Sequence, residues 1–585
     1  MNPRDLLAAL ETLADAPQGI TQIRDLVLNL AVRGQLVPHD PAAQPATDLL
    51  DQCARKRSLL VEQGLLKKKK SPSIVHPLDE PFEVPASWLW IRAGALGELI
   101  RGVTYAKAVS STEPFGQSLP LLRANNIRSS INYEGLVYVP SALVSEVQRL
   151  TPGDFLICMS SGSKNLVGKS AVVTGDVEAS FGAFCSVYRP LASQAGPYLN
   201  RFFQSPLYRE AISATSRGIG INNLRKGDIE ELPLPLPPLA EQLRIVARVD
   251  ELMALLDRLE AAKEARDATR AQLRDAALAA LQDANDAEEV KTAWSRIADN
   301  MHDLFTDPAD IPPLRQTVLQ LAAQGLLVAH DPADDSAIEI VKGVAQEKAR
   351  LVKEKKLRKS KPLAPISDAQ RLFEVPQSWA WVRADDLCLQ ITDGTHHTPT
   401  YVDEGVAFLS VKDISTGRIN FSNCRYIAEK EHAALCKRCQ PELGDVLLTK
   451  VGTTGIAVEV DTDREFSIFV SVALLKLLPN TVFPRFLVHL LNSPLVKLQS
   501  AEGTEGVGNK NLVLRKIRAF TMPLAPYAEQ CRIVEKVDEL MALLDRLESA
   551  LDSCRKIQEA FCGSAVRALP GEPLGVRQDS AMAVG

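Results

Sequence analysis

The same twelve residues occur twice in this chain, as VDELMALLDRLE at 249–260 and again at 537–548. When the comparison starts at Pro235 and Pro523, 21 of 26 positions are identical at a constant spacing of 288 residues. This spacing is far longer than the roughly 20–50 residues of a solenoid repeat. The chain therefore contains two copies of one large module.

Further matched segments extend the duplication. Residues 82–93 match residues 373–384 at 9 of 12 positions, and residues 21–42 match residues 312–333 at 12 of 22. Between these segments, residues 100–230 and 391–518 share only scattered positions. The pattern predicts a common frame that maintains shape, and two divergent inserts that carry specificity.

Composition indicates a multidomain globular protein. The chain has 585 residues, 46% hydrophobic and 24% charged, which predicts several domains. The N-terminus does not resemble a signal peptide, and no apolar run approaches the roughly 20 residues that span a bilayer. The ten cysteines lack framework spacing, so we expect a cytoplasmic protein. The net charge of −5 argues mildly against DNA binding, but residues 239–289, with 12 acidic and 7 basic side chains, could mask basic patches on the inserts.

The repeated segments that follow Pro235 and Pro523 predict long helices. Apolar residues at Val249, Leu252, Leu256 and Leu259 form a stripe close to a coiled-coil seam. We expect this stripe to continue through Leu273, Ala277 and Ala280 of one helix over 239–289. Its expected partner is the helix at 315–327, which is repeated at 24–36. Gly34 and Gly325 are typical helix stops.

The two ends of the chain are expected to pack together. The C-terminal helix, 527–560, has little sequence after it, and the N-terminal segment 3–36 is the second copy of the partner helix. Their packing would close the chain into a circular, pseudo-two-fold arrangement with antiparallel coiled-coil helices. The alternative is two independent domains in tandem.

Both inserts have the pattern of mixed strands and helices, so the predicted fold class is α+β. Short apolar stretches bounded by turn residues predict strands at 87–92, 119–122, 154–159 and 171–173, and at 379–383, 406–411 and 445–449. Trp88 and Trp90 lie two apart on one strand face, as do Trp379 and Trp381. We interpret both pairs as core residues rather than base-stacking ones.

Polar, glycine-rich loops at corresponding places in the inserts are the candidate DNA contacts. Backbone N–H groups and lysines suit phosphates, and Asn and Arg pair with adenine and guanine edges. The candidates in the first insert are Arg123, Asn125, Asn126, Lys164, Asn165, Lys169, Arg217, Asn222, Asn223 and Arg225. Those in the second are Lys412, Lys450, Thr453, Thr454, Lys510 and Asn511. The alternative is that these loops only turn the chain. The basic runs at 67–70 and 353–361 either attract phosphate or are solvated helix ends.

The motifs of several enzyme classes are absent. The sequence has no Asn-Pro-Pro or Asp-Pro-Pro, no His-Glu-x-x-His and no Walker motif. Gly168-Lys-Ser170 lacks the spaced glycine, since position 163 is Ser. A nuclease built from scattered carboxylates stays open. Cys424, His432, Cys436 and Cys439 contain one zinc-like Cys-x2-Cys pair, but the first insert has no equivalent, so no metal is predicted.

Several motifs together resemble the specificity subunit of type I restriction–modification systems. TDGTHHTP at 392–399, VAFLSVKDI at 406–414 and GDVLLTKVGTTG at 444–455 are similar to the family's target recognition domain. PPLAEQLRIV at 237–246 is similar to the start of its spacer helices, and AVRGQLVPHDP at 31–41 to its N-terminal region. The resemblance adds Thr395, His396 and His397 as DNA contacts. The first insert departs from it, because IRGVTY at 100–105 replaces the Asp-Gly-Thr-His stretch.

The resemblance implies a non-catalytic subunit that reads a bipartite asymmetric DNA site. Two recognition domains, 81–236 and 373–524, would alternate with an N-terminal region (1–80), central spacer helices (237–372) and a C-terminal spacer helix (525–585). Two modification subunits would carry S-adenosylmethionine, and two restriction subunits would use ATP and Mg. Residues expected to bind these subunits or build the spacer are Glu241, Arg244, Leu252, Leu256, Leu259, Glu529, Arg532, Leu540, Leu544 and Leu547. The rival interpretations are a single-chain nuclease or methyltransferase and a helical scaffold without a DNA role.

Overall fold

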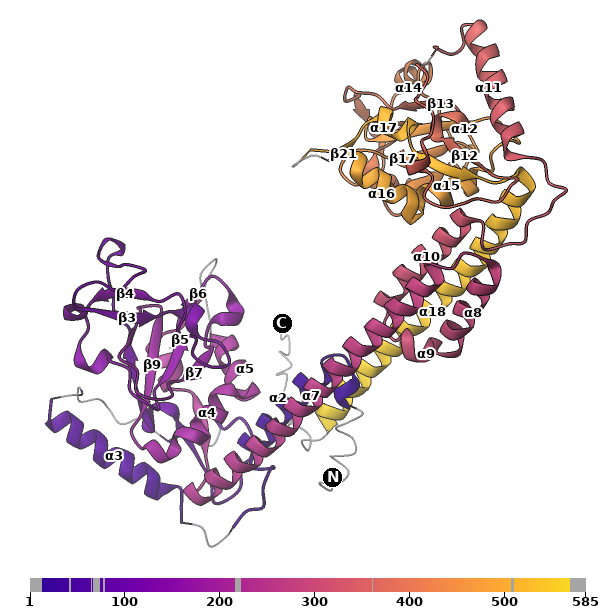
Figure 1. Ribbon diagram of the computed structural model, residues 1–585. Coiled ribbons are helices and arrows are strands. Elements are labelled where there is room, and N and C mark those ends of the chain that lie inside the picture. Colours follow the sequence, from indigo (N-terminus) through magenta and orange to yellow (C-terminus); the bar gives the residue numbers. More distant parts are fainter. Residues whose placement is uncertain are drawn as a thin grey trace, which may run out of the picture. The chain divides into compact units, whose positions relative to one another are not determined.

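The structure is a computed structural model that describes residues 13–40, 44–64, 66, 74–76, 79–215, 222–359, 361–506 and 510–568 (Figure 1). The chain divides into two compact units. Unit 1 consists of residues 1–265 and 555–585, and unit 2 of residues 266–554. Each unit therefore contains one insert and parts of both long helices.

Unit 1 has a four-stranded sheet of order β2 (Gly97–Arg101), β9 (Cys185–Pro190), β5 (Phe155–Cys158) and β7 (Ser170–Val172). A three-stranded sheet has the order β4 (Val137–Pro140), β3 (Ser118–Leu122) and β8 (Ser180–Phe181). Two short pairs join β1 (Leu89–Arg92) to β11 (Pro233–Leu236), and β6 (Ser160–Ser161) to β10 (Asn222–Asn223). The strands predicted in the first insert are confirmed to within two residues.

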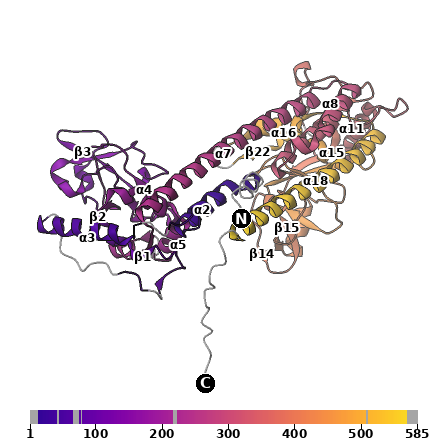
Figure 2. The same cartoon turned by 90° about the horizontal axis from the view of Figure 1, so that it is seen from below.

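The α-helices of unit 1 lie around these sheets. They are α2 (Gly19–Val32), α3 (Thr47–Glu62), α4 (Gly196–Gln204), α5 (Pro206–Thr215), α6 (Lys226–Glu230) and the first part of α7 (Leu239–Gln282). Single 3-10 turns are η2 (Ala93–Ala95), η3 (Lys107–Val109), η4 (Ala124–Asn126), η5 (Ser141–Leu143), η6 (Glu146–Gln148), η7 (Lys164–Leu166) and η8 (Ser193–Ala195). Figure 2 shows α2 beside α5, which it contacts.

Unit 2 repeats this sheet plan. One four-stranded sheet has the order β13 (Cys388–Asp393), β20 (Val472–Leu477), β17 (Val446–Thr449) and β18 (Ala457–Glu459), and the other has the order β14 (Tyr401–Val402), β16 (Arg425–Ile427), β15 (Val406–Leu409) and β19 (Phe466–Ile468). The pairs are β12 (Ala380–Arg383) with β23 (Thr521–Leu524), and β21 (Thr504–Glu505) with β22 (Asn511–Leu512). The prediction of strand through residue 411 was too long, since a helical turn begins at Val411.

The helices of unit 2 form two groups. Around the sheets lie α11 (Ala337–Lys353), α12 (Ala384–Leu387), α13 (Val411–Ile414), α14 (Glu429–Cys436), α15 (Pro484–Asn492), α16 (Pro494–Gly503) and α17 (Leu514–Arg518). Next to the end of α7 lie α8 (Ala287–Asp299), α9 (Met301–Leu304), α10 (Ile311–Gln324) and α18 (Tyr527–Ala568), whose last part belongs to unit 1. The 3-10 turns are η9 (Pro308–Asp310) and η10 (Asp368–Gln370).

Each insert enters and leaves its unit through two adjacent antiparallel strands. Leu89 is opposite Leu236 in the pair β1–β11, and Ala380 is opposite Leu524 in the pair β12–β23. The two ends of each insert are therefore fixed beside each other. The predicted organisation, a repeated frame with two mixed α/β inserts, is confirmed.

The tryptophan next to the first strand of each pair lies in the core, as predicted. Trp88 and Trp379 are each 4% exposed. Gly34 and Gly325 adopt positive φ at the ends of α2 and α10, and a Cβ on either would lie 3.1 Å from its tryptophan ring. These glycines thus stop a helix and also admit the indole.

The partner expected for the apolar stripe was wrong. Val249, Leu252 and Leu256 of α7 pack in one cluster with Ile23 and Val27 of α2, not with α10. The corresponding face of α18, including Val537 and Leu544, packs with Val318 of α10. Each long helix therefore begins against the repeated helix of its own half.

The same ion pairs occur at both helix contacts. Arg24 Nη2 lies 2.5 Å from Asp257 Oδ1 and 2.8 Å from Glu260 Oε2. Arg315 Nη2 lies 2.6 Å from Asp545 Oδ1 and 2.7 Å from Glu548 Oε2. The last two acidic residues of the twelve-residue repeat therefore have the equivalent arginine partner in each unit.

The C-terminal end of each long helix packs in a different hydrophobic core from its N-terminal end. Leu278 and Leu281 of α7 are buried in unit 2, and Arg274 makes an ion pair with Asp310 there. Cys562 of α18 is buried in the core of unit 1, with its Sγ 3.9 Å from the Leu13 carbonyl oxygen. The predicted continuation of the stripe through Leu273 and Ala280 was wrong, since both are exposed, because the two ends of α7 face different neighbours.

The expected helix over 239–289 is two helices. α7 ends at Gln282, and the carboxylate of Asp286 caps α8 by accepting from the N–H groups of Glu288 and Glu289. None of the helices in the described ranges combines the length and apolar composition needed to cross a membrane.

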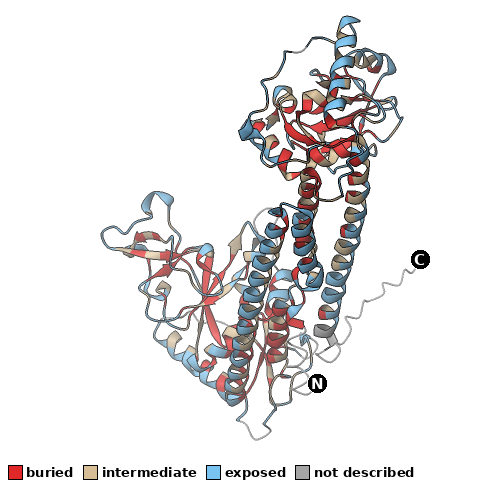
Figure 3. Cartoon of the chain, turned by 45° about the vertical axis from the view of Figure 1, so that its right-hand side comes forward, coloured by how far each residue is buried: buried red, intermediate tan, exposed pale blue. Residues whose placement is uncertain are grey.

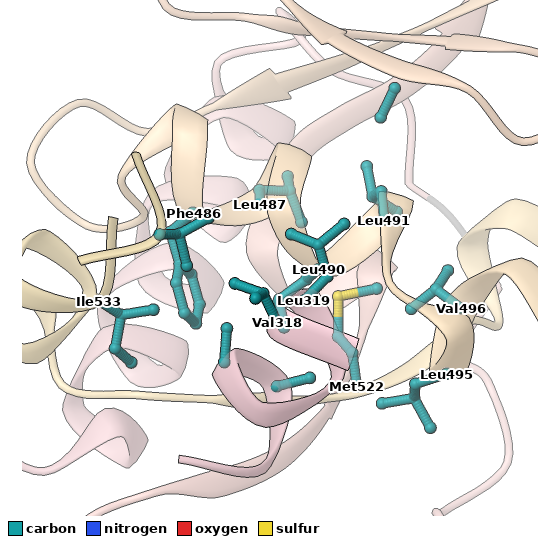
Figure 4. Close-up of a cluster of buried hydrophobic side chains, with 14 of the residues drawn as sticks. Val318, Leu319, Phe486, Leu487, Leu490, Leu491, Leu495, Val496, Met522 and Ile533 are labelled. Carbon is teal, nitrogen blue, oxygen red and sulfur yellow. The ribbon is translucent and has the colours of Figure 1, made fainter. Parts of the chain in front are cut away.

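Apolar side chains from the helices and the second insert share one core. Figure 4 shows Val318 of α10, Leu490 of α15 and Ile533 of α18 in this cluster. Figure 3 shows the buried residues concentrated in the strands and in the helix faces that cover them. The insert is therefore packed onto the helical frame and does not hang from a linker.

Candidate nucleic-acid interface

The two predicted loops of the first insert lie side by side. β6, which follows the strand β5, pairs with β10 so that Asn222 is opposite Ser161 and Asn223 is opposite Ser160. The Leu224 N–H donates to the Met159 carbonyl oxygen at 2.8 Å. The glycine-rich loop and the Gly-Asn loop therefore form one edge, although they are about sixty residues apart in the sequence.

The second insert has the same edge. The Gly452 N–H donates to the Lys510 carbonyl oxygen at 2.9 Å, and the Leu512 N–H donates to the Lys450 carbonyl oxygen at 2.7 Å. Met159 and Lys450 thus hold equivalent backbone positions. We call these two surfaces the loop edges of the first and second domain.

Several first-domain candidates are exposed, as a DNA contact requires. These are Asn125, Asn165, Lys169, Asn223 and Arg225. Arg123 is partly buried and its Nη2 donates to the Gly135 carbonyl oxygen at 2.9 Å. Arg217 lies outside the described residues, as does the run 67–70, and the side chains of Lys164 and Asn222 are not described.

Asn126 is placed differently from the prediction. It is 1% exposed, and its side chain accepts from the Arg123 N–H and donates to the carbonyl oxygens of Asn132 and Glu134. All three bonds lie within 2.8–2.9 Å. An amide so occupied holds the loop together and has no N–H left to donate to a base.

In the second domain the exposed candidates are His396, His397, Lys412, Thr453 and Lys510. Thr454 and Asn511 are partly buried, and the Thr454 hydroxyl lies 3.2 Å from that of Thr504. Thr395 is 5% exposed and its hydroxyl lies 2.8 Å from His397 Nδ1. Thr395 therefore orients the histidine and is not itself at the surface.

The prediction that Lys450 contacts DNA was wrong. Its side chain is 6% exposed and its Nζ lies 2.9 Å from Asp393 Oδ2. Asp393 Oδ1 also lies 3.1 Å from His396 Nε2 and 2.5 Å from Arg438 Nη2. Burial disfavours the charged carboxylate, but Lys450 and His396 outweigh it and lower the pKa of Asp393. Lys450 is thus committed to a buried ion pair.

Asp393 and Arg438 were missed by the sequence analysis. Asp393 lies in the motif at 392–399, but an acidic side chain is not one of the residue types expected to contact DNA. Arg438 is more than 40 residues from Asp393 in the sequence. Arg438, His396 and His397 line a cavity of about 340 Å3.

A basic groove beside the loop edge of the first domain was also missed. It has a volume of about 900 Å3 and is lined by Arg24, Arg128, Lys169 and Arg209, among others. Arg24 and Arg209 are paired with acidic residues of unit 1. Arg128 and Lys169 are exposed, and no ion-pair partner of either lies within the described part of the chain. Their charges are therefore available to a phosphate.

Glu241 and Glu529, predicted to bind partner subunits or to build the spacer, are buried. Glu241 Oε1 accepts from Trp88 Nε1 at 3.0 Å and lies 2.7 Å from His39 Nδ1. Glu529 contacts the equivalent residues, accepting from Trp379 Nε1 through Oε2 at 3.0 Å and lying 2.6 Å from His330 Nδ1 through Oε1. Because both carboxylates are 0% exposed, they fix the insert and the preceding segment to the helix.

The other predicted spacer residues contribute to the helical contacts. Leu252, Leu256 and Leu544 are buried, and Leu259, Leu540 and Leu547 are partly buried against the same clusters. Arg532 Nη2 lies 2.7 Å from Asp334 Oδ2, and Arg244 Nη2 donates to the Pro38 carbonyl oxygen at 3.4 Å. Their observed role is intramolecular.

The four candidate zinc ligands are divided between two environments. His432 lies near Cys436, with its Nε2 3.4 Å from the sulfur. Cys424 and Cys439 belong to a hydrophobic cluster, and burial raises the pKa of Cys439 to about 12. Within the described ranges, no group of three or more His, Cys, Asp or Glu side chains is arranged to hold a metal.

Comparison of the sequence with known proteins identifies the family. The model of the type I restriction modification DNA specificity domain matches residues 95–266. The type I restriction enzyme EcoAI specificity subunit of Escherichia coli is 30% identical over 559 residues, which cover 92% of each chain. This chain belongs to the type I restriction enzyme specificity subunits.

A second specificity subunit of Escherichia coli, from the enzyme EcoEI, is 30% identical over 563 residues and also covers 92% of each chain. Among solved structures, the HsdS subunit from Thermoanaerobacter tengcongensis is 18% identical, covers 83% of this chain and 98% of that one, and gives a TM-score of 0.40. The predicted family is confirmed. The specificity subunit recognises DNA sequence and is not itself an enzyme.

Proposed function

We propose that each recognition domain reads one half of a bipartite asymmetric DNA site through its loop edge. The observation that carries this is the presence of the same loop edge in both domains with different side chains. Exposed Asn, Arg and Lys in the first domain, and exposed His, Thr and Lys in the second, suit base edges and phosphates. Different side chains on one scaffold imply two different half-sites.

The long helices serve as the spacer of this site. Both pass from one unit to the other, α7 between Ala265 and Arg266 and α18 between Cys554 and Arg555. The C-terminal end of α7 packs in the core where α18 begins, and the C-terminal end of α18 packs in the core where α7 begins. This reciprocity supports a closed, pseudo-two-fold arrangement in which α7 and α18 run antiparallel as a coiled coil.

The partners are double-stranded DNA, two modification subunits and two restriction subunits. The modification subunits carry S-adenosylmethionine for adenine methylation, and the restriction subunits carry ATP and Mg for cleavage. The outer faces of α7 and α18, where Leu243, Leu273 and Leu543 are exposed, are the docking surface that we expect for them. The ten unpaired cysteines support a place in the cytoplasm.

An exchange of domains tests the reading role. Residues 384–520 can be replaced by those of a relative, because β12 and β23 hold both ends of this segment together. Methylated adenines are then mapped in cells that also carry the partner subunits. We expect one half-site to change and the other to persist, and the matched exchange of residues 93–232 to have the opposite effect. A change in both half-sites after a single exchange would refute the proposal.

A change of helix length tests the spacer. Seven residues are inserted after Ala265 and seven after Cys554, so that both long helices grow by about 10 Å. We expect the gap between half-sites to lengthen by about three base pairs, at about 3.4 Å each, without a change in either half-site. Insertion in α7 alone is the control, which we expect to impair assembly. An unchanged gap in an active double insertion contradicts the spacer role.

A further inference from the structure

One buried carboxylate joins three separate segments of the second domain. Asp393 ends β13, Arg438 follows α14 and Lys450 follows β17. The Asp393 side chain is 3% exposed, and all three of its cationic or imidazole contacts lie within 3.1 Å. Lys450 also accepts the Leu512 N–H through its backbone, which ties the cluster to the hairpin β21–β22. The carboxylate therefore connects the elements of the loop edge.

The two groups that share Asp393 Oδ1 face solvent. The side chains of Arg438 and His396 are 53% and 62% exposed. Arg438 Nη1 also donates to the Gly394 carbonyl oxygen at 3.3 Å. Gly394 itself is required, because a Cβ there would lie 1.9 Å from the Ile468 carbonyl oxygen. The loop, the arginine and the histidine are thus fixed in one orientation while their outer N–H groups stay accessible.

The charge of the cluster suits nucleic acid in spite of the carboxylate. Asp393 contributes one negative charge, and Lys450 and Arg438 contribute two positive charges, so the cluster carries a net positive charge even with neutral His396. An arginine whose orientation is fixed can donate to a guanine edge or a phosphate. Lys450 is buried, so it compensates the carboxylate and does not reach a ligand.

The fold itself does not need this ion pair. At the equivalent backbone positions the first domain has Arg101, which is exposed, and Met159, which is 7% exposed. Gly102 of that domain packs as Gly394 does, since its Cβ would lie 2.2 Å from the Gly182 carbonyl oxygen. A buried ion pair is in general weak evidence for stability, because apolar replacements are often neutral. Its presence in the second domain only therefore indicates a role in that domain's own contacts.

We propose that Asp393 is a positioning residue that holds Arg438 and His396 for contact with the second DNA half-site. The inference rests on the proposed reading function of the second domain. It adds Arg438 as a specificity-determining side chain and assigns Asp393 the positioning of both Arg438 and His396. Arg438 and His396 touch the DNA, and Asp393 acts through them. The first domain, with Arg101 and Met159 at these positions, reads its half-site without such a cluster.

The test compares Asp393→Asn, Asp393→Asn/Lys450→Met and Asp445→Asn, each in the complex with its modification subunits. Asp445 is a matched control, because it is another buried carboxylate with a lysine partner, at the opposite end of β17. Methylated adenines in the genome of cells expressing the wild-type complex give the site. Binding is then measured on a duplex of that site and on duplexes with single changes in either half.

We expect Asp393→Asn to lower discrimination in the second half-site by about tenfold, the effect of one well-placed base contact, and to leave the first half-site unchanged. The double variant should recover the melting temperature, since no buried charge stays unpaired, but not the discrimination. Recovery of both together would overturn the proposal, and so would an equal loss of discrimination in Asp445→Asn. Arg438→Ala should reproduce the loss without a change in melting temperature.

Failure of this inference is distinct from failure of the proposed function. If exchange of residues 384–520 changes one half-site while Asp393→Asn changes none, the domain reads DNA and Asp393 has only a structural role. If the exchange changes neither half-site, the reading role of the domain is itself wrong.

Discussion

The two recognition domains have the same strand plan but place their buried charges differently. At the strand ends away from the loop edge, both keep an acidic residue with a basic partner: Asp154 with Arg189 in the first domain and Asp445 with Lys476 in the second. At the loop edge, the first domain has Met159 where the second has the buried Lys450. These buried ion pairs are therefore equivalent in the two domains, while the residues at the loop edge, which we propose to meet DNA, differ.

What the halves share most closely is the attachment of the insert to the helix. The contacts of Glu241 with Trp88 and His39 are repeated by Glu529 with Trp379 and His330, with distances that agree to within 0.1 Å. A shared attachment and a differing loop edge allow one frame to present two different surfaces.

The largest effect is expected at this attachment. Glu241→Ala and Glu529→Ala each leave a buried indole N–H without an acceptor and should lower the free energy of unfolding by about 3 kcal/mol. Urea unfolding measures the loss. Glu→Gln at the same positions is the control, because the amide oxygen still accepts from tryptophan. Losses that differ by more than about 1 kcal/mol between the halves would break the equivalence.

A smaller effect is expected from exchanging the basic partners of Asp154 and Asp445. Arg189 donates from Nε and Nη2 to the two oxygens of Asp154, both at 2.7 Å, and Nη2 also donates to the Arg149 carbonyl oxygen. Arg189→Lys should cost about 1.5 kcal/mol, since lysine cannot reproduce this fork.

The reciprocal change, Lys476→Arg, retains the charge beside Asp445 and should be nearly neutral in the same urea measurement. A large loss from Lys476→Arg would show that the two pairs are not equivalent.

A pH-dependent effect should separate the two buried carboxylates of the second domain. The pKa of Asp393 is lowered, so its charge contributes stability above the ordinary value of 3.8, and this contribution is lost as pH falls through the folded-state pKa. Burial raises the pKa of Asp445 in spite of Lys476, so protonation of Asp445 favours the folded state as pH falls.

The stability difference between wild type and Asp393→Asn should therefore shrink on acidification from pH 7 to 3. That between wild type and Asp445→Asn should change in the opposite direction. Urea unfolding at a series of pH values measures both. Parallel profiles would contradict the different environments assigned to the two groups.

The smallest effect on stability is expected at the exposed lysines of the loop edges. Lys169→Ala and Lys510→Ala should change the free energy of unfolding by less than about 0.5 kcal/mol. If each lysine contacts a phosphate, its loss should reduce the slope of log affinity against log salt by about 1. An unchanged slope for one of them would show that the two edges approach the backbone differently.

Sequence alone predicted the duplicated frame and seven of the strands, because these depend on repetition and periodicity. The family was predicted from the resemblance of several motifs. The sequence-based predictions failed where the role of a residue depends on which residue lies next to it in the folded protein. The stripe at Val249–Leu259 identified a buried face of α7 but not α2 as its partner, because a heptad pattern is the same for any apolar neighbour.

The site residues show the same limit. Asn126 and Lys450 have side chains typical of DNA contacts, yet both are buried and bonded to groups of their own domain. Asp393 and Arg438 come together only when β13 and the segment after α14 are folded against each other. No spacing in the sequence indicates this pair.

The contact between Cys562 and Leu13 has a consequence for the order in which the protein folds during synthesis. The two residues are 549 positions apart, yet both lie in the core of unit 1. At roughly 5–20 residues per second, translation of the intervening chain takes about half a minute to two minutes. Although the first insert leaves the ribosome early, the helical core beside it is completed only when the last helix has been made. A chain that terminates prematurely would therefore expose an unfinished core at its beginning, where chaperones and proteases could recognise it.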